Sequence, residues 1–154
     1  MHKVTLILLL LMTSFSLAAQ NDTFAQAVGK QRVVLVFAPA EDDPHFKEQR
    51  TEMRHHLREC SDYDLLLVSA ALHAGPSRPP ADPLSGSLSG DEQAAARRRF
   101  HILPDEFTVL LLGKDGGEKL RSKDVLTLST IAAAIDAMPM RQQEVEHRRT
   151  RPRR

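Results

Sequence analysis

The sequence predicts one α/β domain in which helices cover both faces of a mixed β-sheet. Two patterns lead to this fold class. Continuous apolar runs at 32–39 and 64–71 flank an amphipathic segment at 44–60, which is the order of a strand, a helix and a second, parallel strand. Further along, strand-like runs at 107–113 and 118–122 are joined by an Asp-Gly turn, which predicts an antiparallel hairpin.

Residues 1–19 have the features of a secretory signal peptide. A basic start at Lys3 precedes an apolar run at 4–12 and small residues ahead of a cleavage point after Ala18 or Ala19. The run is shorter than the ~20 apolar residues that span a membrane, so we expect no transmembrane segment after cleavage. The mature protein is expected to be soluble and secreted, with the bacterial periplasm as its compartment.

The strand-helix-strand unit accounts for the first part of the mature chain. Its first strand, 32–39, is rich in β-branched residues and closes at Pro39. Pro44 suits the first turn of a helix. One face of that helix repeats the apolar residues Phe46, Met53, Leu57 and Cys60.

The second part begins with a loop. Glycine, proline and serine dominate 73–90, which leaves too few packing groups to order the segment alone and predicts a long mobile loop. Asp91 and Glu92 then start a short helix with arginines near its end, as the helix dipole favours. After the hairpin, a last helix that ends before Pro139 is predicted by the spacing of Leu128, Ile131, Ile135 and Met138.

We expect the folded domain to cover 24–144 and residues 145–154 to form a basic disordered tail. Five arginines occupy the last seven positions, while the rest of the mature chain is mildly acidic. A mature chain of about 135 residues is long enough to bury one core. The only cysteine, Cys60, excludes an intramolecular disulfide.

Three segments carry a family resemblance: RVVLVFAP near the start, LLLGKDGGEKLR in the hairpin and IDAMPMRQQE after the last helix. With the order β-α-β-α-β-β-α, they resemble the thioredoxin-like secreted family catalogued as domain of unknown function (DUF) 4174, which is related to a domain of animal extracellular proteins with sushi repeats. The resemblance implies a thioredoxin-like, or peroxiredoxin-like, sandwich and assigns no activity. The motif residues are Gly113, Asp115, Gly116, Gly117, Asp136, Met138, Pro139, Met140 and Arg141.

The glycine-rich segment of the hairpin invites comparison with phosphate-binding loops. In such loops a lysine follows the glycines and a helix comes next, whereas here Lys114 precedes them and a short strand follows. We therefore interpret the segment as a turn. Lys119, Arg121 and Lys123 alternate along the following edge strand, where charges deter edge-to-edge pairing. Together with Lys114 they could instead form an anion-binding patch.

Thiol chemistry is the first function that the fold suggests. Thioredoxin-like enzymes carry their reactive cysteine between the first strand and the first helix, but 38–46 has no cysteine, and its acidic residues would oppose a thiolate. Pro104 is also displaced from the start of the third strand. Cys60 continues an apolar helix face and is expected in the core. The alternative is a thiol-dependent antioxidant or peroxiredoxin-like enzyme that uses Cys60.

The sequence thus favours a thioredoxin-like binding or structural module without redox cysteines. It also favours a protein without enzymatic activity over an enzyme. We predict no catalytic residue, cofactor or metal ligand. A helical row of acids and histidines resembles a solvated, ion-paired face more than a metal site. A partner could be an anionic component of the cell envelope, or a protein. Nucleic acid is not expected, because the aromatic residues that read RNA are missing from the predicted strands.

The motif after the last helix has a predicted structural role. Met138 is expected to complete the apolar stripe of that helix, and Met140 to turn back over the end of the core. Asp136 and Arg141 are expected near the exposed helix end, where their pairing would contribute only ~1 kcal/mol.

Overall fold

The structure, a computed structural model, describes residues 26–73 and 85–150. The predicted leader, most of the predicted 73–90 loop and the last four residues of the predicted tail lie outside the described part.

Five strands form one mixed sheet in the order β3-β2-β1-β4-β5. The strands are β1 (Arg32–Ala40), β2 (Leu65–His73), β3 (Ser85–Ser87), β4 (Thr108–Leu112) and β5 (Glu118–Ser122). The parallel pairing of β1 with β2 and the antiparallel pairing of β4 with β5 confirm the predicted unit and the predicted hairpin. β4 also pairs antiparallel with β1, so the sheet is mixed.

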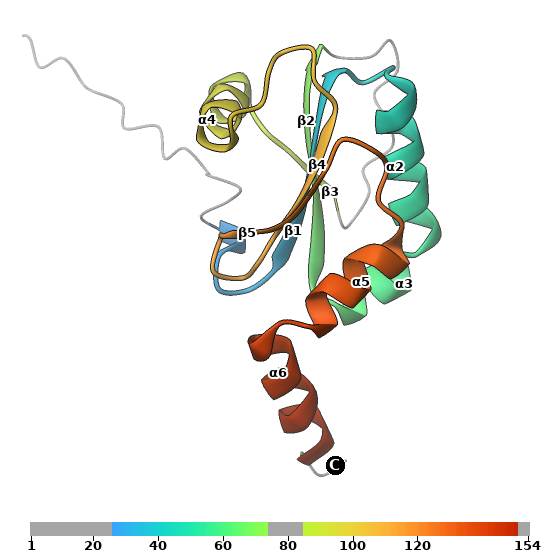
Figure 1. Ribbon diagram of the computed structural model, residues 1–154, viewed down its shortest axis with the longest axis vertical. Helices are drawn as coiled ribbons and strands as arrows, with labels where there is room; N and C mark the ends of the chain where they lie inside the picture. Colours follow the sequence, from blue (N-terminus) through green and yellow to red (C-terminus); the bar gives the residue numbers. More distant parts are fainter. Residues whose placement is uncertain (1–25, 74–84, 151–154) are drawn as a thin grey trace, which may run out of the picture.

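Helices cover both faces of this sheet (Figure 1). α2 (Pro44–His55), α3 (Leu57–Asp62) and α5 (Leu128–Asp136) lie on one face, and α4 (Gly90–Phe100) lies on the other. A further helix, α6 (Pro139–Thr150), extends away from the end of the sheet. None of the described helices has the length and the apolar character that crossing a membrane requires.

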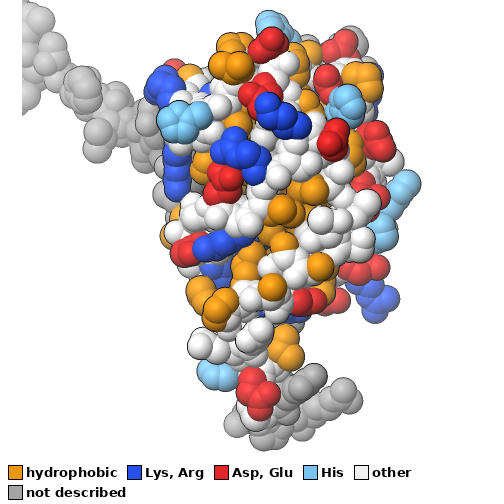
Figure 2. All heavy atoms as spheres, in the orientation of Figure 1, with side chains coloured by type: hydrophobic (Ala, Val, Ile, Leu, Met, Phe, Trp, Pro, Cys, Tyr) orange, Lys and Arg blue, Asp and Glu red, His pale blue; other side chains and the backbone are white. Residues whose placement is uncertain are grey.

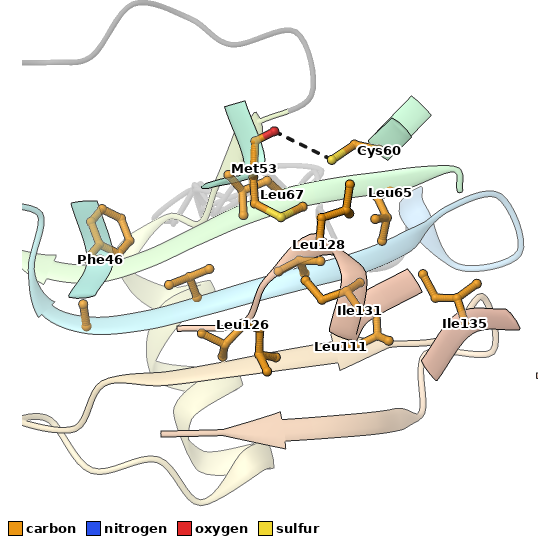
Figure 3. Packing of buried hydrophobic residues seen from close by; sticks show 14 of the residues in the cluster. Phe46, Met53, Cys60, Leu65, Leu67, Leu111, Leu126, Leu128, Ile131 and Ile135 are labelled. Atoms are coloured by element: carbon orange, nitrogen blue, oxygen red, sulfur yellow. Dashed lines mark hydrogen bonds between the residues drawn. The ribbon is translucent and has the colours of Figure 1, made fainter. Parts of the chain in front are cut away.

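The central strand β1 is apolar throughout because both of its faces are covered. Val34 and Val36 enter the cluster under α2, α3 and α5, while Leu35 and Phe37 enter the cluster under α4. Figure 3 shows the first cluster, in which Cys60 lies among aliphatic side chains.

The helix predicted over 44–60 is in fact two helices. His56, with φ of −118°, ends α2, and α3 starts at the next residue. The break turns Leu57 away from the predicted apolar face, so its side chain is 36% exposed, whereas Cys60 remains buried. Periodicity alone did not reveal this break because no proline or glycine marks it.

The short strand β3 lies within the segment predicted as a loop. It pairs with Leu67–Ser69 of β2 through its backbone, and its Ser-Gly-Ser sequence has no apolar pattern that would predict a strand. Ser89 then starts α4 with a capping box, in which its side chain accepts a hydrogen bond from the Glu92 amide and the Glu92 carboxylate accepts one from the Ser89 amide.

The prediction of a disordered tail from residue 145 is wrong as far as Thr150, because α6 continues to that residue. The prediction that the preceding helix ends before Pro139 is confirmed, because α5 stops at Asp136. The same proline is the first residue of α6, a position where its missing N–H costs nothing and its fixed φ suits a helix. Pro139 therefore separates two helices instead of ending the folded chain.

Candidate ligand-binding pocket

A pocket of about 340 Å³ lies between the β4–β5 turn and the junction of α5 with α6. It brings together the two motif segments, 113–117 and 136–141, that the sequence holds apart. The turn side contributes Gly113, Lys114, Asp115 and Lys119, the helix side contributes Ala134, Ala137, Met138, Pro139 and Met140, and Arg32 from the start of β1 completes the lining.

Glycines shape the turn side of the pocket. Gly116 has φ of +73°, a conformation that side chains disfavour, and its amide donates to the Gly113 carbonyl at 2.9 Å. A Cβ on Gly113 would lie 2.6 Å from Cε of Lys119 and 2.6 Å from Oδ1 of Asp115. The absence of a side chain at Gly113 thus lets Lys119 lie across the turn. These contacts confirm that the glycine-rich segment is a hairpin turn.

Two residues that line the pocket, Arg32 and Lys114, are bonded to the carboxylate of Glu144 in α6. Arg32, only 1% exposed, donates from Nη2 to both carboxylate oxygens of Glu144 at 3.1 and 3.2 Å, and from Nη1 to the Tyr63 carbonyl at 3.0 Å. Nζ of Lys114 is 2.8 Å from Glu144 and 2.9 Å from Asp64. Burial would raise the pKa of Glu144, but the hydrogen bonds from Lys114 and Arg32 outweigh burial and lower it.

Arg141 attaches the first turns of α6 to α3 and α5. Its guanidinium lies 4.6 Å from the centre of the Tyr63 ring and donates to the Asp62 carbonyl at 3.3 Å and to Asp136 at 3.4 Å. The Tyr63 hydroxyl donates to Asp136 at 3.0 Å. Burial, and then this hydrogen bond, raise the pKa of Tyr63.

These contacts correct two expectations. Arg141 is only 8% exposed and is not a surface charge, because its guanidinium packs on the Tyr63 ring and bonds to α3 and α5. Met140 is 51% exposed at the pocket and does not cover the core, because the chain continues into a helix instead of turning back. Met138 packs partly buried against the core, as expected.

The four predicted anion-patch residues each have a carboxylate partner. Besides Lys114, the pairs are Lys119 with Asp115 at 2.6 Å, Arg121 with Glu118 at 2.7 Å and Lys123 with Glu106 at 3.2 Å. Figure 2 shows basic and acidic side chains next to one another on the face it presents. An incoming anion would compete with a carboxylate at every one of these positions, and only Lys114 and Lys119 line the pocket.

Sequence reasoning missed Arg32 and Glu144. Arg32 was treated as the first residue of a strand, although a charged residue that opens a doubly covered strand must find a partner or incur a large desolvation cost. This rule could have predicted from the sequence that Arg32 has a buried partner. Glu144 could not have been assigned to Arg32 because the two are joined only by the fold.

The sulfur of Cys60 is packed away from solvent, as expected. The residue is 2% exposed in α3, and its Sγ lies 3.8 Å from the Met53 carbonyl (Figure 3). Where thioredoxin-like enzymes hold their thiol, between β1 and α2, Asp43 instead caps α2 by accepting the Phe46 amide at 3.0 Å. The pocket lies at the opposite end of β1, where the strand begins at Arg32.

The described residues include no group of three or more His, Cys, Asp or Glu side chains placed to hold a metal ion. In the row of acids and histidines on α2, Glu52 accepts the Leu128 amide at 2.9 Å, and His45 packs on the Phe107 ring at 5.3 Å. These two side chains therefore make contacts with neighbouring elements.

A five-stranded mixed sheet with this strand order, sandwiched between helices, is a thioredoxin-like fold. The chain belongs to the family described as domain of unknown function (DUF4174), whose model matches residues 23–144.

Solved structures support the fold. The chain is similar to the reduced 2-Cys peroxiredoxin of Plasmodium vivax, with 15% identity over 77% of this chain and 83% of that chain and a TM-score of 0.58. The chain is also similar to a putative thiol:disulfide interchange protein, DsbE, from Chlorobium tepidum. The identity is 13% over 72% of this chain and 84% of that chain, and the TM-score is 0.52. At these identities the likeness shows the fold alone. No match was found among curated proteins.

Proposed function

We propose that the protein is an exported, thiol-independent binding module whose ligand site is the pocket between the β4–β5 turn and the α5–α6 junction. One observation carries the proposal: the two segments that resemble the family, 113–117 and 136–141, meet at this pocket. Sites that combine an apolar wall with a few placed polar groups are typical of ligand binding.

Thiol independence is supported by the position of Cys60. A nucleophilic cysteine must be accessible and ionised, and its pKa falls near cations or helix N-termini. Cys60 is buried among Met53 and Leu65, and the loop after β1 carries Glu41, Asp42 and Asp43 instead of a cysteine. The competing function, a peroxiredoxin-like enzyme using Cys60, is favoured only by the likeness of folds.

Export is proposed from the leader pattern at 1–19, with the bacterial periplasm as the proposed destination. Mass spectrometry of the protein recovered from the cell envelope tests this step. We expect a chain that begins at Ala19 or Gln20, and a chain that retains Met1 would contradict export with cleavage.

The binding function can be tested by NMR screening of small-molecule fragments against the isotopically labelled mature protein. We expect fragments to shift the amide signals of 113–119, 134–138 and 140 and to lose affinity in Ala137→Leu, which extends a larger side chain into the pocket. Ala133→Leu is the matched control, since Ala133 is exposed in α5, one turn before Ala137, and does not line the pocket. Binding confined to other surfaces, or no binding, would contradict the proposal.

Peroxide and disulfide reduction should be compared in the wild type and in Cys60→Ser. We expect no difference, because the sulfur of Cys60 is shielded by the core. A thiol-dependent reaction that Cys60→Ser abolishes would instead establish the enzyme.

A further inference from the structure

We propose that the pocket binds a small zwitterion with an apolar side chain, the chemistry of an apolar α-amino acid. This inference rests on the proposed binding function and specifies its ligand. We infer the ligand by separating the charged side chains that a ligand can reach from those that are already paired within the protein.

The two least exposed cations of the pocket, Arg32 and Lys114, are held by the protein. Arg32 is bonded to both oxygens of Glu144, and Lys114 bridges Glu144 and Asp64 with a side chain that is 13% exposed. A ligand that took Arg32 or Lys114 would remove one of the two cations that neutralise the largely buried carboxylate of Glu144, which is unfavourable. Arg32 and Lys114 therefore stabilise the fold and are not available to pair with a ligand.

The pair at the rim is different. Nζ of Lys119 lies 2.6 Å from Oδ2 of Asp115, with side chains that are 33% and 53% exposed. Such exposed pairs contribute little to stability, so a ligand can separate them at small cost. Asp115 is also held by the Gly117 amide at 3.0 Å, and hydrogen bonds from Lys119 and then Gly117 lower its pKa, so the carboxylate stays ionised.

Charge balance selects the ligand. An anion that bonds Lys119 would leave Asp115 without its cation, and a cation that bonds Asp115 would leave Lys119 without its anion. A molecule that carries an ammonium and a carboxylate on neighbouring atoms meets both needs, with the carboxylate toward Lys119 and the ammonium toward Asp115.

The opposite wall requires an apolar group. Ala134, Ala137, Met138 and Met140 line it, and methionine adapts to side chains of different shapes. A volume of about 340 Å³ is at the small end of the ~300–1,000 Å³ usual for ligand sites, which suits one amino acid and not a lipid or a folded peptide.

The test is an NMR titration of the mature protein with four probes: L-leucine, N-acetyl-L-leucine, L-leucinamide and glycine. We expect saturable leucine shifts at 113–119 and 134–140. The two singly charged analogues should bind at least about tenfold more weakly, because each leaves one rim charge unpaired, and glycine should also bind more weakly, because it lacks the apolar group.

Two variants test the roles of the rim residues. Lys119→Gln and Asp115→Asn should each weaken leucine binding about tenfold, while Asn retains an oxygen for the Gly117 amide. Glu118→Gln is the control, because it removes an ion pair in the same hairpin outside the pocket and should leave affinity unchanged. Unchanged amide spectra of the free variants show that each is folded.

The outcomes separate this inference from the binding function on which it rests. If N-acetyl-leucine or leucinamide binds as tightly as leucine, or if only unrelated fragments bind in the pocket, the zwitterion inference is overturned and the binding module stands. If no small molecule of any class binds in the pocket, the proposed function itself fails.

Discussion

Glu144 is one of the residues that attach α6 to the rest of the domain. Its carboxylate joins three elements, because it pairs with Arg32 at the start of β1 and with Lys114 in the hairpin. We expect Glu144→Gln to reduce the free energy of unfolding by about 2–4 kcal/mol, near the lower end of the cost of breaking a buried pair, since its side chain is 21% exposed. Urea unfolding measures this, and Glu146→Gln, an exposed change on the same helix, should cost less than about 0.5 kcal/mol.

The same carboxylate predicts a pH dependence. Because the pKa of Glu144 is lower in the folded protein than in the unfolded chain, where it is about 4.3, its stabilisation is complete above that value and is lost as the pH falls through the folded pKa. The difference in stability between wild type and Glu144→Gln should therefore shrink from pH 6 towards the acid range. A difference that stayed constant with pH would argue against an ionic role.

Arg141 is expected to matter more than its predicted surface position suggested. Truncation of Arg141 to Ala removes the ring contact with Tyr63 and the hydrogen bonds to Asp62 and Asp136, so we expect a loss of about 2–4 kcal/mol in denaturant unfolding. Met138→Ala should cost less, about 1–2 kcal/mol, because Met138 is only partly buried. Arg141→Lys should restore little, since lysine lacks the planar fork. If Met138→Ala were the more damaging change, packing would outweigh the polar contacts here.

At the scale of elements, a side chain of α2 holds the segment that leads into α5. Gln49 is fully buried and forms two hydrogen bonds with the backbone of Leu126, donating to its carbonyl at 2.9 Å and accepting from its amide at 2.7 Å. The arrangement imitates a strand pairing where no strand is present. It fixes the approach of α5 to the sheet and therefore one wall of the pocket.

We expect Gln49→Met, which keeps the volume and removes both hydrogen bonds, to lower the free energy of unfolding by about 2–4 kcal/mol. The cost arises because a buried amide and a buried carbonyl lose their partners. Glu48→Met, on the exposed side of the same helix, is the matched control and should change little. Hydrogen exchange of the Leu126 amide gives a direct readout, and unchanged protection in Gln49→Met would contradict the account.

For the whole molecule, α6 divides into an anchored and an extending part. The contacts of Arg141 and Glu144 lie in its first half, and in Figure 1 the rest extends away from the sheet. A chain truncated after Glu146 should retain the stability of the full protein, whereas truncation after Met138 should lose at least about 3 kcal/mol, because Arg32 and Lys114 lose Glu144. Thermal and urea unfolding of the two truncated proteins measures the difference. Equal stability of both would show that the ionic contacts of α6 are not needed.

Elements that depend on interactions between residues close in sequence could be predicted, and those that depend on distant residues could not. The buried strands, the hairpin and the helix starts depend on neighbouring residues, so periodicity and turn chemistry were sufficient for β1, β2, β4, β5 and α4. The break at His56, the strand β3 and the second role of Pro139 depend on what packs or pairs nearby. These features have no local sequence signature.

The sequence by itself determined the thioredoxin-like fold class, through the order of its strands and helices and its family resemblance. It also determined the lack of a cysteine after the first strand and the burial of Cys60, because these follow from residue type and local pattern. Only the tertiary structure decided that the GKDGG and DAMPMR segments face one pocket, and that Glu144 partners Arg32 and Lys114. The physical reason is that a buried charge is stable only beside its partner. Chain folding chooses that partner among residues far apart in sequence.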